Sequence, residues 1–161
     1  MTDQLFIRSA IDADAGTIVQ FIADLAAYEN LSHEAKATET DILRDLFGGD
    51  PKVFCEIAEW EGNPVGFALW FYTYSTFQGR YGIWLEDLYV DPSMRGKGLG
   101  KAMLVNLAQR CVAEGLGRFE WWVLDWNEPS IEFYKSQGGV MQDEWTKVRV
   151  DCEALLKLGA P

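Results

Sequence analysis

"RGKGLGKAML", residues 95–104, places three glycines at alternate positions among basic side chains, directly before an apolar run. The apolar run predicts a helix that begins at the end of the glycine loop. Backbone N–H groups at a helix start, together with nearby cations, form a cradle for a phosphate. The stretch therefore predicts a phosphate-binding turn. The alternative that it leaves open is a plain glycine-rich turn with lysines for solubility.

Two common phosphate-binding loops do not match this stretch. Walker A loops have a glycine five positions before the Gly-Lys pair and Ser or Thr after it. This chain has Arg95 and Ala102 at those two places, and it has Lys101 where the dinucleotide-binding fingerprint needs its third glycine. What remains is Arg95-x-x-Gly98-x-Gly100 at the mouth of a helix, which suits a pyrophosphate and requires no metal.

Hydrophobic periodicity and turn residues predict the elements on both sides of the loop. Apolar residues recur at three- and four-residue steps from Asp14 to Glu29, which indicates an amphipathic helix, and Thr38 with Asp41 resembles a capping box. The full expected order is a strand over 5–10, helices over 14–29 and 38–47, a hairpin within 52–75 that turns at 62–64, a strand over 82–90, the helix after the loop ending at 115–117, a strand over 118–126, a helix from 127 to 138–139, a strand over 139–150 and a helix over 152–158. This order predicts one mixed α/β domain over residues 1–161.

Composition bounds the class of protein. The 161 residues are 48% hydrophobic, which suits one domain with a sizeable core. The first residues lack the charged and then apolar pattern of a signal peptide, and the longest apolar run, 65–77, is shorter than the roughly 20 residues of a bilayer span. We therefore expect a soluble, cytoplasmic protein without membrane contact.

Charge and the reactive residue types narrow the function further. The net charge of −11 argues against nucleic-acid binding and favours a cationic partner, although acidity also serves solubility alone. Three well-separated cysteines indicate neither a disulfide framework nor a metal site. The single histidine, His33, argues against a Ser-His-Asp triad and against a histidine-rich metal site. No metal is expected.

Four segments together resemble a known family. Residues 95–100 match the R/Q-x-x-G-x-G/A signature of the GNAT acetyltransferases, which bind acetyl-coenzyme A (acetyl-CoA) through its pyrophosphate. "LAAYEN" (25–30), "YGIWLEDLYV" (81–90) and "WNEPSIEFYKSQG" (126–138) are similar to the diamine (spermidine/spermine) N-acetyltransferase branch and its thialysine-acetylating relatives. The resemblance covers nearly the whole chain, and residues 126–138 are its most specific part.

The resemblance implies a fold, a co-substrate and an assembly. The implied fold is a central mixed, mostly antiparallel sheet flanked by helices, and the implied assembly is a homodimer. Backbone or side-chain contacts with acetyl-CoA are implied for Leu88, Tyr89, Val90, Arg95, Gly96, Lys97, Gly98, Leu99, Gly100, Lys101, Asn127 and Ser130. Among these, Leu88 to Val90 are implied to supply a backbone N–H for the thioester oxygen, and helix capping is a competing role for Asn127.

Glu86 is the candidate general base. An alkyl ammonium has a pKa of about 10.4, so a positioned base and a desolvated pocket lower the barrier to its attack. Strand alternation puts Trp84, Glu86, Leu88 and Val90 on one face and Leu85, Asp87 and Tyr89 on the other. A carboxylate between Leu85 and Leu88 on a core strand needs a partner, which is either a substrate ammonium or a lysine or arginine of this chain.

Tyr134 is the candidate general acid. It lies one helical turn after Ser130, so both side chains share a helix face. A phenol with a pKa near 10 is protonated at pH 7 and can give its proton to a departing thiolate. Packing beside Phe133 is the structural alternative, and the resemblance favours catalysis because GNAT members commonly keep a tyrosine there.

The amine pocket is expected to be acidic. Tyr28 and Glu29 resemble the branch's substrate-binding pair, Glu144 roughly matches a second acidic contact, and Glu86 and Asp87 complete the set. Glu29 as an exposed helix-end acid and Asp87 as a structural partner are the alternatives. Arg80, before the strand with Glu86, suits the carboxylate of a lysine-like amino acid better than a polyamine, or is a solvated loop residue.

These observations predict an N-acetyltransferase that moves acetyl from acetyl-CoA to a primary amine of a small cationic substrate. The substrate class is a diamine, a polyamine or a thialysine-like amino acid, and transfer is direct in a ternary complex. Cys55 and Cys111 lie in apolar patterns without a local histidine, which argues against an acyl-enzyme. The alternatives are a protein lysine or N-terminal acetyltransferase and a non-catalytic acyl-CoA-binding sensor.

Overall fold

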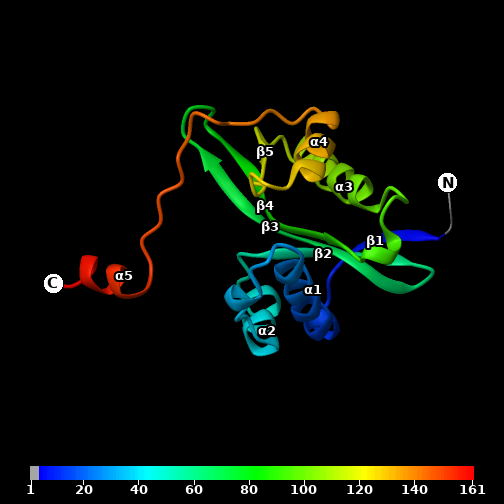
Figure 1. The fold of residues 1–161 in the computed structure, drawn as a ribbon, viewed down its shortest axis with the longest axis horizontal. Coiled ribbons are helices and arrows are strands. Elements are labelled where there is room, and N and C mark those ends of the chain that lie inside the picture. Colours follow the sequence, from blue (N-terminus) through cyan, green and yellow to red (C-terminus); the bar gives the residue numbers. More distant parts are fainter. Residues whose placement is uncertain (1–3) are drawn as a thin grey trace. The chain divides into compact units, whose positions relative to one another are not determined.

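The computed structural model describes residues 4–161 (Figure 1). Contacts within the chain group it into two units, of which the first ends at Trp122 and the second runs from Val123 to Pro161. The sequence predicts one domain over the whole length, and this stays a prediction. No described helix has the length and apolar character that crossing a membrane requires.

A five-stranded sheet forms the centre of the first unit. Its strands lie in chain order, β1 (Leu5–Ser9), β2 (Phe54–Trp60), β3 (Asn63–Ser75), β4 (Arg80–Val90) and β5 (Phe119–Glu120). The pairs from β1 to β4 are antiparallel, and β5 runs parallel to β4. The mixed, mostly antiparallel sheet that the sequence predicts is thus confirmed.

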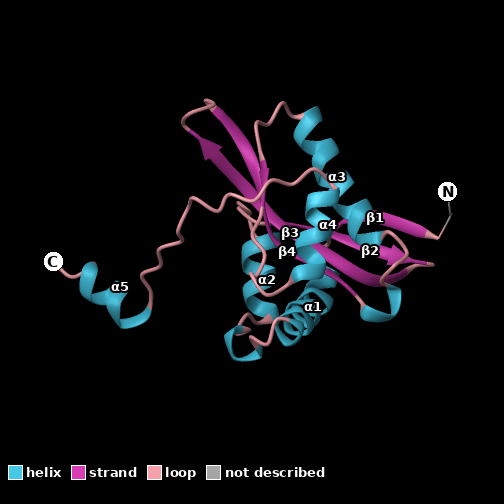
Figure 2. Cartoon of the chain, turned by 45° about the horizontal axis from the view of Figure 1, so that its top comes forward, coloured by secondary structure: helices cyan, strands magenta, loops and turns pink. Residues whose placement is uncertain are grey.

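Helices cover both faces of this sheet. Figure 1 shows α1 (Ala15–Tyr28) and α2 (Glu39–Phe47) on one face and α3 (Leu99–Ala113) on the other, and Figure 2 shows the same unit in a second view. The predicted capping box of α2 is present, since the Thr38 hydroxyl accepts from the Asp41 N–H and the Asp41 carboxylate accepts from the Thr38 N–H. Short 3-10 turns occupy Asp12–Asp14, Ser32–Glu34 and Pro92–Met94.

The core lies where alternate strand residues meet these helices. Ile18 and Phe21 of α1 pack against Ile57, Phe67 and Tyr89 of the sheet, and all five are buried. On the α3 face the fully buried side chains include Met103 and Leu107. Because strand side chains alternate between faces, the two helical layers bury both sides of the same strands. The strand β4, which carries the candidate site, therefore lies between two buried layers of side chains.

The second unit contains α4 (Glu128–Ser136) and α5 (Cys152–Leu158), both close to their predicted bounds. Two strand predictions are wrong. The strand expected over 118–126 is reduced to Phe119–Glu120, and residues 139–150 form no strand. The alternating pattern of residues 139–150 marks side chains that suit a sheet, but a strand also needs a hydrogen-bonding neighbour, and the described residues 123–161 contain no strand to supply one.

Candidate active site

A β-bulge in β4 is the central feature of the site. Leu69 of β3 pairs with Asp87, and the next residue, Trp70, pairs with Leu85. Glu86 is therefore the extra residue on β4. Bulges of this kind bend a strand and redirect its side chains, and they are frequent beside active sites. The first two acidic residues of the candidate site thus lie at the one irregular point of the β3–β4 ladder.

The bulge corrects the predicted alternation of β4. Leu85 lies opposite Trp70 and Leu88 lies opposite Ala68, and these two β3 residues share a face because they are two positions apart. Leu85 therefore shares a face with Leu88, rather than with Asp87 and Tyr89 as an unbroken strand predicts. Because of the inserted residue, each β4 side chain before Glu86 faces the side of the sheet opposite to the one that regular alternation from Asp87 predicts.

Glu86 lies in solvent. Its side chain is exposed, and its carboxylate Oε2 accepts a hydrogen bond from the Trp84 indole Nε1 at 2.8 Å. The expectation that it is buried between Leu85 and Leu88 is wrong, because the bulge turns it outward. An exposed carboxylate that is oriented by an indole N–H suits the binding of a cation.

Asp87 is the less exposed member of the pair, and its side chain is half-buried. Desolvation by burial, together with the negative charges of Glu86 and Glu29, raises its pKa to about 7. Glu29 is half-buried at the end of α1, and burial raises the pKa of its carboxyl as well. The sequence expects Glu29, Glu86 and Glu144 to converge. The structure brings Glu29 to the Glu86–Asp87 pair, while Glu144 lies in the second unit, exposed and outside any helix or strand.

Tyr28 connects this acidic cluster (Glu29, Glu86 and Asp87) with the glycine loop. The Arg95 guanidinium lies 4.7 Å from the centre of the Tyr28 ring, a cation–π contact between the loop and the end of α1. Arg95 Nε also donates to the carbonyl of Val90 at 3.2 Å, which fixes the loop to the end of β4. The predicted amine site and the predicted coenzyme loop are therefore neighbours within the first unit.

The glycine loop has the geometry of an anion cradle. Gly96 and Gly98 have φ values of 79° and 83°, in the left-handed region that favours glycine, and Gly98 is the N-cap of α3. The Ala102 N–H is bonded to the Gly98 carbonyl, so the N–H groups of the preceding first turn have no acceptor within the helix. Nothing among the described residues lies within 4 Å of a Cβ placed at Gly96, Gly98 or Gly100. This open, donor-rich turn fits a pyrophosphate, with Lys97, Leu99 and Lys101 beside it.

We expect Gly98→Val to raise the KM for acetyl-CoA by about tenfold or more, because valine is strained at this positive φ and its side chain fills the open cradle. Steady-state kinetics with varied acetyl-CoA measures the effect. Gly62→Val is the matched control, since Gly62 has a φ of 79° and equally open surroundings in the β2–β3 turn. Equal changes in the KM of both variants would contradict a coenzyme role for Gly98.

One edge of β4 lacks a strand neighbour along the candidate site. Among residues 4–122, β5 pairs with β4 only at Ile83 and Trp84, so the edge from Leu85 to Val90 on that side extends past the end of β5. The other edge is paired with β3, and Tyr89 is buried against α1. An open strand edge presents backbone N–H and C=O groups to a ligand. This accords with the backbone contact that the sequence resemblance implies for Leu88 to Val90.

The remaining predicted residues lie on α4 in the second unit. Asn127 is buried directly before α4, and its side chain makes no capping hydrogen bond, so the capping alternative is wrong for this side chain. Ser130 and Tyr134 are both half-buried and four residues apart on the helix, and therefore share a face as expected. The Tyr134 ring lies 5.4 Å from that of Phe133. Their roles remain predictions.

Other reactive groups are poorly suited to catalysis. Cys55 and Cys111 are buried, and burial raises the pKa of both thiols, which disfavours the nucleophilic thiolate. His33 is exposed beside Glu34. Arg80 begins β4 seven residues before Asp87, roughly 23 Å along a strand, and so lies outside the acidic cluster. Among residues 4–161, no three His, Cys, Asp or Glu side chains are arranged so that they could hold a metal ion.

Sequence reasoning did not find the bulge or the importance of Asp87. The sequence "LEDLYV" shows two adjacent acids in an apolar strand, and this is the one signal that an extra residue is present, because regular alternation would bury one of them. Which of the two is buried depends on the register with β3, which the sequence does not show. The structure therefore reverses the two acids: Asp87 is the desolvated carboxyl and Glu86 the exposed one.

Comparisons with known proteins agree with this geometry. The acetyltransferase (GNAT) family matches residues 19–138. The chain is 36% identical to the thialysine N-epsilon-acetyltransferase of Sus scrofa, over 96% of each chain. It is 34% identical to the spermidine/spermine N(1)-acetyltransferase-like protein 1 of Homo sapiens, over 97% of this chain and 24% of that protein.

The fold has relatives among solved structures. An integron cassette protein from the mobile metagenome of V. cholerae superposes with a TM-score of 0.83 at 23% identity, over 99% of this chain and 100% of that one. This likeness concerns the fold alone. With a matching family over residues 19–138 and relatives above one-third identity along nearly its full length, the chain belongs to the GNAT acetyltransferases, enzymes that use acetyl-CoA.

Proposed function

We propose that this enzyme acetylates a primary amine of a small cationic molecule, namely a diamine, a polyamine or a thialysine-like amino acid. The observation that carries the proposal is the cluster of Glu29, Glu86 and Asp87 at the β4 bulge, beside the glycine loop. Three carboxylates in one place repel each other unless a cation joins them. A substrate with one or more ammonium groups relieves that repulsion.

The charge of the whole chain supports the same class of substrate. A net charge of −11 attracts cations and raises their concentration near an acidic site. Relatives named for thialysine and for spermidine/spermine differ in whether the acceptor carries a carboxylate. Arg80 lies too far along β4 to bind that carboxylate at the bulge. The cluster itself therefore offers contacts to ammonium groups only, which suits a diamine or polyamine as well as an amino acid side chain.

The two acids at the bulge, Asp87 and Glu86, have different roles toward the amine. Asp87 accepts the proton that the substrate ammonium loses, because a base with a pKa of about 7 is ionised in part at neutral pH and still holds a proton well. Glu86 and Glu29 hold the cationic substrate in place. The sequence assigns the base to Glu86; its exposure and its hydrogen bond to Trp84 favour binding of the ammonium instead.

Acetyl-CoA supplies the acetyl group as a thioester. In this proposal the glycine loop from Arg95 to Lys101 binds its pyrophosphate, and backbone N–H groups between Leu88 and Val90 stabilise the negative charge on the thioester oxygen. The amine forms its C–N bond while the C–S bond breaks, without an acyl-enzyme. The Tyr134 hydroxyl then gives its proton to the leaving sulfur, and the second proton that the acetylated nitrogen loses restores the phenol. Asn127 and Ser130 contact the coenzyme, and Glu144 adds an acidic contact for the substrate.

A homodimer and a cytoplasmic location belong to the same proposal, on the strength of the resemblance alone. The alternative of a protein lysine or N-terminal acetyltransferase is less well supported. The acidic cluster offers contacts to a positive charge and none that would bind a peptide backbone. The sensor alternative is disfavoured by the presence of both a titratable carboxyl at neutral pH and a tyrosine on α4.

An acceptor panel tests this function. We expect release of free thiol with diamines of graded length, spermidine and thialysine, and a kcat/KM at least about tenfold lower with a lysine peptide of neutral charge. Raising the ionic strength should raise the KM for the amine more than the KM for neutral acceptors, because salt screens the cluster. Preference for the peptide would favour protein acetylation. Tight CoA binding without turnover of any amine would favour the sensor.

A further inference from the structure

The β4 bulge brings Trp84 onto the same face of the sheet as Asp87. Trp84 pairs with Phe71 of β3, and Asp87 pairs with Leu69, two residues before Phe71. Residues two positions apart on a strand share a face, so the side chains of Trp84 and Asp87 share one as well. An unbroken β4 would place them on opposite faces, because they are three residues apart in the chain. Along the ladder they are separated by two residues of β3, about 7 Å.

The Trp84 indole holds the carboxylate of Glu86. Its Nε1 donates to Glu86 Oε2 at 2.8 Å, a length typical of charge-assisted hydrogen bonds. An exposed glutamate otherwise has several accessible rotamers, and ordering it when a ligand binds costs conformational entropy. The bond to the indole selects a rotamer in advance, with the carboxylate turned toward Trp84 on the upstream part of β4.

The indole is itself held in place. Trp84 is half-buried, and its ring lies 4.9 Å from that of Trp122 at an interplanar angle of 87°. Aromatic rings favour this edge-to-face arrangement. The backbone of Trp84 is paired on both sides, with Phe71 of β3 and with Glu120 of β5. The donor that orients Glu86 therefore belongs to the most firmly paired part of β4.

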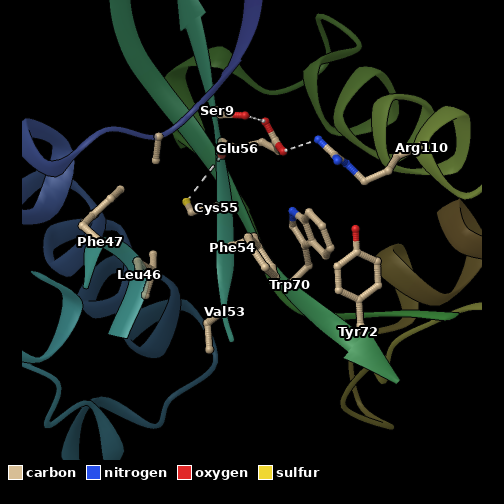
Figure 3. Close-up of a pocket in the computed structure, with 11 residues that line it drawn as sticks. Ser9, Leu46, Phe47, Val53, Phe54, Cys55, Glu56, Trp70, Tyr72 and Arg110 are labelled. Atoms are coloured by element: carbon tan, nitrogen blue, oxygen red, sulfur yellow. Dashed lines mark hydrogen bonds and ion pairs between the residues drawn. The ribbon is translucent and has the colours of Figure 1, made fainter. Parts of the chain in front are cut away.

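The structure gives Glu86 a donor and leaves its charge without a cation of this chain. Within residues 4–161 its carboxylate bonds to the indole and to no lysine or arginine. Glu56 of β2 differs, because its carboxylate accepts from Ser9 Oγ at 3.3 Å and lies 3.5 Å from Arg110 Nη2 (Figure 3). A neutral indole orients a carboxylate without neutralising it. Glu86 is thus prepared for a positive group that comes from a ligand.

The two acids at the bulge offer two separate anionic points. Asp87 lies close enough to Glu29 for the charge of Glu29 to act on it, whereas Glu86 is turned toward Trp84. Ordinary N–C and C–C bond lengths put the two ammonium groups of an extended four- or five-carbon diamine about 6 to 8 Å apart. The separation of Trp84 from Asp87 along the ladder is comparable, about 7 Å. The two ammonium groups of thialysine are likewise separated by five chain atoms.

We propose that Trp84 is a positioning residue that makes the enzyme prefer acceptors with two ammonium groups. It holds Glu86 for the second ammonium group, while the first, which receives the acetyl group, lies at Asp87. The inference rests on the proposed function and adds to it the spacing of the two charges, four or five chain atoms.

The test compares putrescine with butylamine, which has the same four carbons and one ammonium group fewer. With the unaltered enzyme we expect kcat/KM to be about tenfold higher or more for putrescine. Trp84→Phe keeps a ring and removes the N–H donor. It should raise the KM for putrescine by about tenfold at nearly unchanged kcat, and should change the kinetics with butylamine by less than about twofold.

Tyr81→Phe is the matched control. It also removes one polar group from an aromatic ring of β4, but Tyr81 pairs with Tyr74, three residues from Phe71, and therefore lies on the opposite face from Trp84. The control should behave like the unaltered enzyme with both amines. Equal losses with putrescine and butylamine in Trp84→Phe would show a merely structural role for Trp84 and overturn the proposal.

A double variant shows whether Trp84 acts through Glu86. Glu86→Gln should remove the preference for putrescine, and Trp84→Phe added to it should raise the KM by less than about twofold more. A further rise by the full factor of the single variant would mean that the indole acts without Glu86, and would refute the positioning role. If Trp84→Phe does not fold by circular dichroism, Trp122→Leu takes its place and should reduce the preference by about threefold or more. An unchanged preference in that variant would overturn the proposal.

The unaltered enzyme separates this inference from the function on which it rests. If neither putrescine nor butylamine yields free thiol, the proposed function itself fails. If both are acetylated with equal kcat/KM, small amines are acceptors, but the selection of a second ammonium group by Glu86 and Trp84 is refuted.

Discussion

Replacing Asp87 by asparagine is expected to lower kcat by about a hundredfold or more and to abolish the rise of kcat/KM with pH near 7. Burial raises the pKa of this carboxyl to about 7, and a base acts in its ionised form. Activity of the unaltered enzyme should therefore increase as the pH rises through about 7. Asparagine neither ionises nor accepts the ammonium proton, so the variant should show no such increase. Measuring kcat/KM from pH 5.5 to 9, from about 1.5 units below the expected pKa to about 2 units above it, tests this.

Glu86→Gln separates the two acids at the bulge. We expect it to raise the KM for the amine while the pH dependence near 7 persists, because Glu86 binds the substrate and Asp87 carries the proton. If the pH dependence disappears in Glu86→Gln and survives in Asp87→Asn, the roles are reversed and the base is Glu86.

The raised pKa of Asp87 also predicts how the free energy of unfolding depends on pH. Asp87 holds its proton in the folded protein up to about pH 7, whereas an unfolded aspartate loses it near its ordinary pKa of 3.8. The folded state therefore binds more protons between these values, and this residue's contribution to the free energy of unfolding falls as the pH rises through that window. Asp87→Asn removes the dependence. Denaturant unfolding at pH 5, inside that window, and at pH 8, about one unit above it, should show a smaller loss of stability in the variant than in the unaltered protein.

The second large effect concerns Tyr134. Tyr134→Phe should lower kcat by about a hundredfold at pH 7, because the phenol that protonates the leaving sulfur is removed. The KM for acetyl-CoA and the thermal stability should change little, since phenylalanine keeps the ring that lies 5.4 Å from Phe133. Tyr74→Phe, at an exposed tyrosine of β3, is the matched control and should behave like the unaltered enzyme. A kcat for Tyr134→Phe within about twofold of the control would mean that another group or a water protonates the sulfur.

Local signals in the sequence predicted the helices and the loop well. The capping box at Thr38 and Asp41 and the glycines before Leu99 act over one helical turn, so their geometry follows from neighbouring residues alone. The central strands were also predicted, because their alternation reflects two buried faces. The strands expected over 118–126 and 139–150 failed for the opposite reason. A strand is stabilised by the strand beside it, and its residues alone do not show that neighbour.

The candidate site shows the same division. The sequence by itself determined the type of loop, the presence of acidic residues at the end of α1 and in β4, and the class of chemistry that these residues perform. Only the tertiary structure decided which acid is buried, because the register between β3 and β4 makes Glu86 the bulge residue and leaves Asp87 facing α1 and Glu29. The pKa of a carboxyl depends on the solvent and charges around it, and here those come from segments nearly sixty residues apart in the chain.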